Sequence, residues 1–156
     1  MAIIIEKNPN GDTRTAPNGI TFEQFQKAND MHREDVRKVM SFLAYRISRT
    51  GMKHDYTKKS DEELFYNDFL STMNSGADFT KCEWYQMHIN SERHHLSSRC
   101  PDDVNLIDVI EMIADCVCAG MARSGYVRDL EISSDIIERA VKNTVELIVK
   151  EINLVN

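Results

Sequence analysis

The sequence predicts an all-α protein, a bundle of about five principal helices that follows an irregular N-terminal segment. Apolar residues recur at spacings of three and four along most of the chain, which is the helical period. Capping boxes and glycines divide these periodic stretches into segments of helix length. Alternating strand patterns are nearly absent, apart from one short candidate at residues 3–5. A length of 156 residues suits one domain, so we expect an irregular segment over 1–20 and a single helical domain over 21–156.

The first long helix is expected from Thr21 to Gly51. Thr21 and Gln24 have the spacing of a capping box, in which each side chain pairs with the other residue's backbone. Upstream, residues 8–12 and 17–19 are rich in Asn, Pro and Gly and predict turns. The apolar face of this helix is formed by Phe22, Phe25, Val36, Val39, Met40, Leu43 and Ile47.

Two shorter helices are expected in the middle of the chain. Ser60 with Glu63 has the spacing of a second capping box, and the helix that it opens should stop before Gly76. Thr80 with Glu83 has the spacing of a third, which opens a helix of similar character.

The two C-terminal helices follow a loop expected at residues 93–103. One helix should run from about Asp103 to Ser124, with Gly125 as its left-handed cap. The other should start near Ser134. Its apolar stripe consists of Ile136, Ile137, Ala140, Val141, Val145, Ile148, Val149 and Ile152.

Composition and charge exclude several classes of partner. The net charge is −6 and no run of Lys and Arg matches a phosphate backbone, so we do not expect binding to duplex nucleic acid. No apolar stretch approaches the roughly 18–20 residues of a membrane span, and the apolar start at residues 1–5 is too short for a signal peptide. We therefore expect a cytoplasmic protein with reduced cysteines, and the mixed exposed side of the last helix permits a homodimer.

Three carboxylates mark the helix at 103–124 as a candidate part of a site. Asp108, Glu111 and Asp115 share one face of a helix that is otherwise apolar nearly all round. A buried carboxylate must pair with a cation, coordinate a metal ion or take up a proton, because an unpaired buried charge costs several kcal/mol. That face either points to solvent or lines a charged site, and we expect Asp115 to lie in a site.

The five histidines all fall between positions 32 and 95. His32 lies on the apolar face of the first helix, where it is either a core histidine bonded to a carbonyl group or a ligand. His54 and Asp55 follow Gly51 at a helix junction, with Lys58 one turn further on. These three side chains form either a solvated turn or a charged site.

His88 and the pair His94-His95 belong to the third helix and the loop after it. The loop can bring one member of the pair back towards His88, although the sequence does not tell which. Arg93, like Ser91 and Arg99 near it, either binds an anionic group or is an ordinary loop residue.

In this order the residues resemble the HD superfamily of metal-dependent phosphohydrolases, and more closely a small uncharacterised HD-like family that is frequent in bacteriophage and bacterial genomes. The resemblance covers about residues 30–125. It implies an α-helical, HD-domain-like bundle with a buried metal site and hydrolysis of phosphomonoesters or phosphodiesters. The matching segments are His32; His54-Asp55-Tyr56-Thr57-Lys58; His88 with His94-His95; and Glu111-Met112-Ile113-Ala114-Asp115.

The resemblance also implies a ligand set for one or two divalent transition-metal ions. The residues at the positions of the primary metal's ligands are His32, His54, Asp55 and Asp115. Those at the positions of a second metal's ligands are His88 and either His94 or His95. Imidazole and carboxylate ligands suit Mn, Fe, Co, Ni or Zn without choosing among them. Many members carry an acid where this chain has Lys58, which leaves the general acid open.

The expected function is therefore attack of metal-activated water on a small phosphoester, a nucleotide by family analogy. Asp55, Lys58 and Glu111 would be the catalytic residues; Lys58, together with Arg93, would contact the phosphate. Glu111 would orient a ligand histidine, or else form a plain salt bridge. Two rival hypotheses are a non-catalytic helical interaction protein of phage type, acting in the host cytoplasm with vestigial site residues, and a binuclear iron oxygenase.

Overall fold

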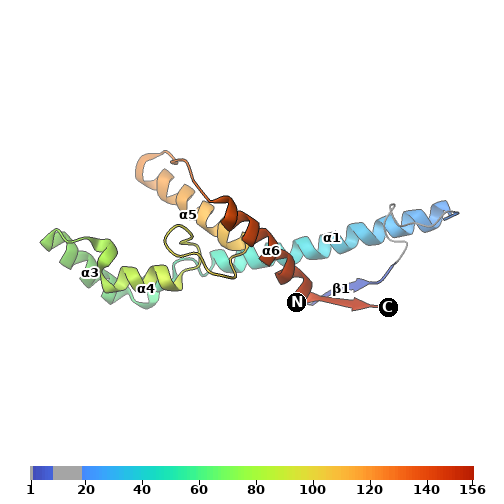
Figure 1. Cartoon of the computed structure of the whole chain (residues 1–156), viewed down its shortest axis with the longest axis horizontal. Helices are drawn as coiled ribbons and strands as arrows, with labels where there is room; N and C mark the ends of the chain where they lie inside the picture. The colour runs from blue at the N-terminus through green and yellow to red at the C-terminus, as the bar shows by residue number, and fades with distance from the viewer. Residues whose placement is uncertain (1, 9–18) are drawn as a thin grey trace. The chain divides into compact units, whose positions relative to one another are not determined.

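The chain folds as an all-α protein, as the sequence predicts. The computed structural model describes residues 2–8 and 19–156, and all elements named below lie within them. Figure 1 shows these helices and the small pair of strands. The helices are α1 (Phe22–Gly51), α2 (Tyr56–Ser60), α3 (Glu62–Ser75), α4 (Glu83–Ser91), α5 (Leu106–Ser124) and α6 (Ser134–Glu151), with a 3₁₀ turn η1 (Phe79–Lys81) and strands β1 (Ile3–Glu6) and β2 (Ile152–Val155). The five principal helices expected are α1, α3, α4, α5 and α6, and α2 is an additional short turn.

Two compact units make up the chain. Residues 1–46 and 145–156 form the first unit, and residues 47–144 form the second. Helices α1 and α6 each contribute residues to both units. The expectation of one helical domain over 21–156 stays a prediction. Within the described part of the chain, none of the helices is long and apolar enough to cross a membrane.

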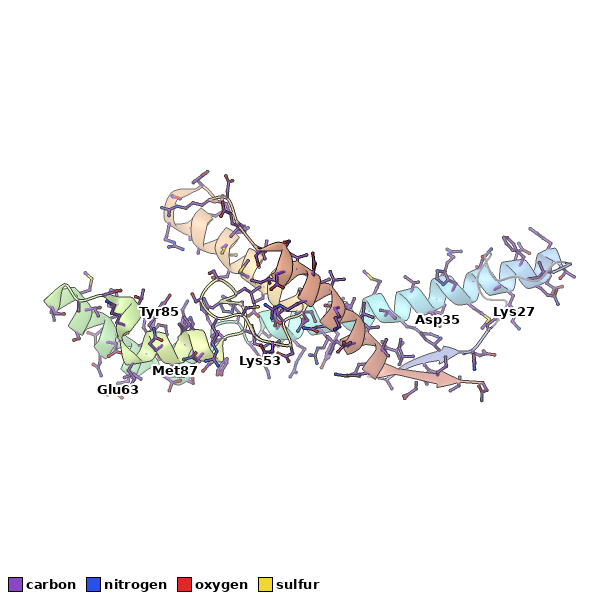
Figure 2. The ribbon with its side chains drawn as sticks, viewed as in Figure 1. Lys27, Asp35, Lys53, Glu63, Tyr85 and Met87 are labelled. Atoms are coloured by element: carbon purple, nitrogen blue, oxygen red, sulfur yellow. The ribbon has the colours of Figure 1, made fainter. Side chains whose placement is uncertain are left out.

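The first unit contains a parallel pair of strands that the sequence predicted only in part. β1 was expected, and it pairs with β2 in the register Ile3↔Ile152 to Glu6↔Val155. β2 was not expected, because Ile152 continues the apolar stripe of the last helix; pairing with β1 overrides that local preference. The Lys38 ammonium donates to the Ile4 carbonyl at 2.9 Å and to Asp35 (labelled in Figure 2) at 2.8 Å, which ties α1 to β1.

The start of α1 has the predicted capping box. The Thr21 backbone N–H donates to Gln24 Oε1 at 2.9 Å, and the Gln24 N–H donates to Thr21 Oγ1 at 3.2 Å. The turns expected at 8–12 and 17–19 fall mainly on residues 9–18, which lie outside the described residues.

The starts of α3 and α4 differ from the predicted caps, although both helices are present. The N-cap of α3 is Asp61, since Ser60 ends α2. The N-cap of α4 is Cys82, whose sulfur accepts from the Tyr85 N–H at 3.4 Å, because Thr80 is taken up by η1. Gly76 and Gly125 end their helices at the predicted positions, and both adopt the left-handed conformation, which was predicted for Gly125.

The core of the second unit packs α5 against the first part of α6. Its buried apolar side chains are Leu96, Val104, Val109, Met112 and Ala140. A capping box of Asn105 and Asp108 starts α5, and the Leu106 N–H donates to Thr144 Oγ1 at 2.9 Å. This packing fixes the rotation of α5 and thereby the direction of its polar face.

An aromatic stack fixes α4 on α3. The Trp84 ring stacks on Phe65, with ring centroids 3.8 Å apart, and on His88, with centroids 4.7 Å apart. Phe79 and Tyr85, the latter labelled in Figure 2, extend the cluster. Trp84 thus holds one face of a histidine that the sequence marks as a candidate ligand.

Gly120 is required where the chain turns back along α5. A Cβ atom at this position would lie 2.7 Å from the Tyr126 carbonyl oxygen and 3.2 Å from Val127 Cα. We expect Gly120→Ala to destabilise the protein by about 1–2 kcal/mol in urea unfolding, because displacing that backbone outweighs the gain in helix propensity. Gly51→Ala is the matched control, since a Cβ there meets no atom within 4 Å in the described structure. Equal stability of the two variants would contradict this prediction.

Candidate metal site

The backbone at Asp55 directs its carboxylate into the second unit. Asp55 lies between α1 and α2 with φ 54° and ψ 34°, and it is the one non-glycine residue with positive φ in segments 2–8 and 19–156. Aspartate tolerates this left-handed conformation better than most residues. The carboxylate does not cap α2 within the described chain, so its oxygens are free for other partners.

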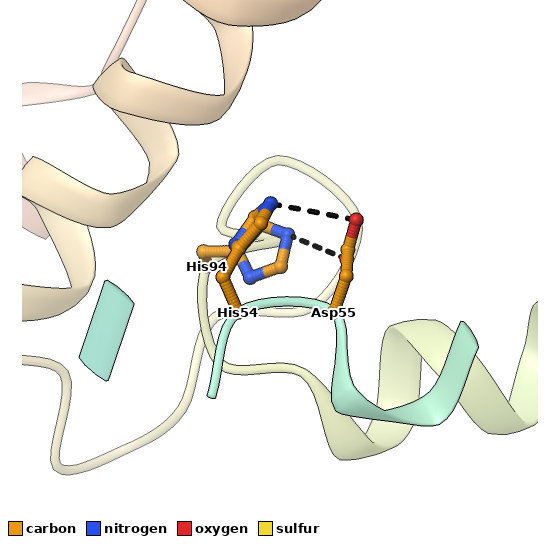
Figure 3. A group of neighbouring side chains, drawn as sticks. All are labelled: His54, Asp55 and His94. Carbon is orange, nitrogen blue, oxygen red and sulfur yellow. Dashed lines mark ion pairs between the residues drawn. The ribbon is translucent and has the colours of Figure 1, made fainter. Parts of the chain in front are cut away.

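Three imidazoles converge on the Asp55 carboxylate. His54 Nε2 lies 3.4 Å from Oδ2, and His94 Nε2 lies 3.5 Å from Oδ1 (Figure 3). His88 Nε2 also lies 3.5 Å from Oδ1. The three side chains come from the turn after α1, from α4 and from the loop after α4. In each ring the same nitrogen faces the carboxylate.

Glu111, from α5, holds the opposite nitrogens of two of these rings. Its Oε1 is 3.1 Å from His54 Nδ1 and 3.4 Å from His94 Nδ1. A carboxylate only accepts hydrogen bonds, so it favours the tautomer of His54 with the proton on Nδ1. The Nε2 lone pair of His54 then points towards Asp55.

A relay of two buried residues fixes His88 in the same way. Glu92 Oε1 accepts from the Thr57 N–H at 2.9 Å and from the Thr57 hydroxyl at 2.6 Å. Because the hydroxyl proton is used in this bond, Thr57 Oγ1 accepts from His88 Nδ1–H at 2.7 Å. His88 therefore carries its proton on Nδ1, and its Nε2 is an acceptor.

His95 completes a second potential ligand group, in addition to the group of His54, Asp55 and His94. Its Nε2 lies 2.8 Å from His88 Nε2, and it donates in this contact because His88 Nε2 has no proton. Asp55 with His54 and His94, and Asp55 with His88 and His95, each offer three ligand atoms within 4.8 Å of one another. Both members of the His94-His95 pair thus contribute, and Asp55 belongs to both groups.

Two charged side chains lie at the edge of this cluster. Asp115 Oδ1 is 3.5 Å from His54 Nε2, and the Lys58 ammonium contacts Asp55 Oδ2. Lys58 supplies one positive charge against the carboxylates of Asp55, Glu111 and Asp115. With neutral imidazoles the excess of two negative charges matches one divalent cation.

One buried polar atom supports a cation at this place. Asp55 Oδ1 is inaccessible to water and forms no hydrogen bond with any described residue. An unsatisfied buried carboxylate oxygen is costly, and a metal ion next to the surrounding Nε2 atoms would satisfy it. The donor set of imidazole and carboxylate is typical of transition-metal sites.

The electrostatic environment gives most of these groups the protonation states that a metal ion needs. Burial raises the pKa of Asp55, but Lys58 outweighs it and lowers that pKa below its ordinary value. Burial likewise raises the pKa of Glu111, but the two histidines that it contacts lower it. Burial and the neighbouring His95 lower the pKa of His88 to about 4. Burial and His94 lower the pKa of His95. The carboxylates are therefore ionised and these two imidazoles neutral near pH 7.

His94 differs from the other histidines. Burial lowers its pKa, but Glu111 and the further carboxylates outweigh burial and raise it. In its protonated form His94 would compensate part of the negative charge of the cluster, and a bound cation would replace that proton.

Two other residues predicted for the site, His32 and Arg93, belong to neither ligand group. His32 is exposed on the part of α1 that belongs to the first unit, rather than turned to a core as its apolar neighbours predicted, and neither ligand group includes it. Arg93 donates two hydrogen bonds of 2.8 Å to the Asp108 carboxylate. It also donates to the Asp103 carboxylate at 2.9 Å and to the Asp103 backbone carbonyl at 3.1 Å. The roles of His32 as a ligand and of Arg93 as a phosphate contact stay predictions.

The loop residues named beside Arg93 also have protein partners. Arg99 donates to Asn90 Oδ1, and the Ser91 hydroxyl donates to Met87. Asp108, on the acidic face of α5, serves as cap and as partner of Arg93. Only Glu111 and Asp115 of that face reach the cluster.

Sequence reasoning missed the roles of Thr57 and Glu92. Both are buried, and together they set the tautomer of His88. Thr57 lies within the His-Asp motif, and this position in the sequence could have indicated its role in the site. Glu92 follows an amphipathic helix like any surface acid, and its burial arises only from tertiary packing.

Fold and site together define an α-helical protein with partly buried histidine–aspartate groups that could hold a metal ion. The chain belongs to a family of unknown function (DUF5662), whose family model matches residues 21–152. The searches of curated proteins and of solved structures found no match.

Proposed function

We propose that the protein is a metal-dependent phosphohydrolase, whose cluster binds one or two divalent transition-metal ions and acts on a small phosphoester. The observation that carries the proposal is the convergence of three imidazole Nε2 atoms on Asp55, two of them with Nδ1 fixed by a hydrogen bond. Such support from outside the ligand set is typical of metal-binding histidines. The resemblance of the motifs to the HD superfamily adds to it, and a nucleotide is the favoured substrate by that analogy.

The proposed ligands divide into the two groups that share Asp55. His54, Asp55 and His94 would hold one ion, with Asp115 next to His54 as a further oxygen donor. Asp55, His88 and His95 would hold the other. Mn, Fe, Co, Ni and Zn all suit these donors. The metal content of a His32→Gln variant decides whether His32 is a further ligand.

The residues of the chain would orient the substrate and stabilise charge. When bound, a divalent ion lowers the pKa of a water molecule and polarises a phosphoryl oxygen. The Lys58 ammonium, half-exposed beside Asp55, would stabilise negative charge on the phosphate. Glu111 would keep His54 and His94 with Nε2 directed at the reaction centre.

Trp84 provides a direct readout of metal binding. It is the single tryptophan of the chain, and its ring stacks on His88. We expect stoichiometric Co²⁺ or Ni²⁺ to quench its fluorescence, because a paramagnetic ion on His88 Nε2 would lie next to the indole. His88→Gln should remove the quenching by an ion in the group of Asp55, His88 and His95.

The matched control is His32→Gln, a change of the same type at an exposed position. We expect this variant to keep the quenching and the metal content of the wild-type protein. Quenching that is unchanged in His88→Gln would contradict an ion in the group of Asp55, His88 and His95. Loss of metal in His32→Gln would restore His32 to the ligand set.

A phosphate-release screen over nucleotides and simple phosphoesters, with the metal-loaded protein, tests the activity itself. Bound iron with a charge-transfer band and no phosphate release would favour the oxygenase hypothesis instead. Absence of stoichiometric metal after purification without chelator would favour the non-catalytic interaction protein.

A further inference from the structure

A largely apolar pocket of about 250 Å³ adjoins the cluster within the second unit. His54, Glu111 and Asp115 form its polar side. Ile47, Ile107 and Ile110 belong to its apolar walls, which come from the end of α1 and from one face of α5. The pocket is therefore continuous with the proposed metal site.

The cluster is closed on the side of α4 and open on the side of this pocket. The side chains of His94 and His88 are only 2% and 4% exposed. His54 and Asp115 are 28% and 32% exposed. A ligand that reaches the cluster past His54 and Asp115 must therefore place the rest of its body at or in the pocket.

The chemistry of the pocket walls limits which part of a ligand the pocket can hold. The charged or ionisable side chains of the pocket wall are those of the cluster itself, apart from the thiol of Cys118. A sugar or a second phosphate would lose its hydration there without compensating partners. An apolar cavity of about 150 Å³ is sufficient to bind benzene, so this pocket has room for one ring or a short alkyl chain.

We propose that this pocket binds the compact apolar group of an organic phosphoester whose phosphate lies at His54 and Asp115. The inference rests on the proposed function and specifies its substrate class. It predicts that an aryl or alkyl phosphoester is preferred over inorganic phosphate and over sugar phosphates, including the nucleotides that the family analogy favours.

Cys118 allows the pocket to be probed by binding rather than by turnover. Its thiol is exposed and lines the pocket. Alkylation by iodoacetamide, followed by peptide mass spectrometry, would be measured on the Mn²⁺-loaded protein with phenylphosphonate, methylphosphonate or inorganic phosphate. We expect phenylphosphonate to protect Cys118 at a concentration about tenfold or more below that of methylphosphonate, as burial of a ring requires. Cys82, at the start of α4, serves as the internal control and should react at an unchanged rate.

A variant that fills the pocket distinguishes binding of the ring from binding of the phosphate. Ala114 lies on the pocket wall, so Ala114→Phe should weaken phenylphosphonate binding about tenfold or more and leave calorimetric binding of inorganic phosphate unchanged. Ala122→Phe, on the exposed surface of α5 outside the pocket wall, should change neither affinity. Equal protection by phenylphosphonate and methylphosphonate would overturn this inference alone. Failure of all three phosphorus ligands to bind would overturn the proposed function, and the inference with it.

Discussion

Asp55→Asn is expected to reduce metal affinity by more than about 100-fold and to abolish any phosphate release. Changing a residue that only supports a metal ligand typically lowers metal affinity about 10–100-fold. Asp55 itself belongs to both proposed ligand groups, so the loss should be larger. The substitution keeps the size of the side chain and removes its charge. Asparagine also tolerates the left-handed backbone at φ 54°, so the local fold should persist, which Asp55→Ala would not ensure. Metal content and Trp84 quenching by Co²⁺ measure the effect.

Two further variants make this result specific. Asp102→Asn removes one negative charge from an exposed loop of the same unit, and it should retain full metal binding. Lys58→Met should also retain the metal, while losing activity if the ammonium contacts the phosphate. Full metal content in Asp55→Asn would count against a metal centre in this cluster.

The sequence predicted the helices well because their signals are local. The capping box of Thr21 and the glycines at 76 and 125 act within a few residues of their own position. β2 could not be predicted, since Ile152 fits a helical stripe and becomes a strand only by pairing with β1. The caps predicted for α3 and α4 were wrong for a similar reason, because Ser60 and Thr80 belong to short helical turns that precede these helices.

The site was predictable where residue type alone limits the choice. The His-Asp pair, His88 and the acids of α5 stand out because ionisable groups on apolar elements need partners. Their distances to one another depend on packing between segments far apart in the chain, as in the contacts of His54 with Glu111, 57 positions away, and with Asp115. The sequence could not separate Asp108, which caps α5, from Glu111, which supports the histidines, since both lie on the same helix face.

Arg93→Met is expected to destabilise the protein by about 3 kcal/mol. Arg93 binds both oxygens of Asp108, whose side chain is 5% exposed, and this contact raises the pKa of Arg93 above its usual range. Removing one partner of a buried ion pair costs about 3–5 kcal/mol. The lower end applies because the Arg93 side chain is 41% exposed and partly screened by water. Unfolding in urea at pH 7 measures the loss.

A double variant tests whether the cost arises from the uncompensated charge of Asp108. Asp108→Asn combined with Arg93→Met should recover part of the stability, because a neutral amide can still cap α5 without leaving a buried anion. Asp103→Asn removes the other partner of Arg93, which is 80% exposed, and should cost less than about 1 kcal/mol. If Arg93→Met unfolds like the wild-type protein but loses phosphate binding, Arg93 acts on the substrate and its pairing with Asp108 is secondary. The stability measurement therefore distinguishes a residue that fixes the start of α5 from one that contacts the phosphoester.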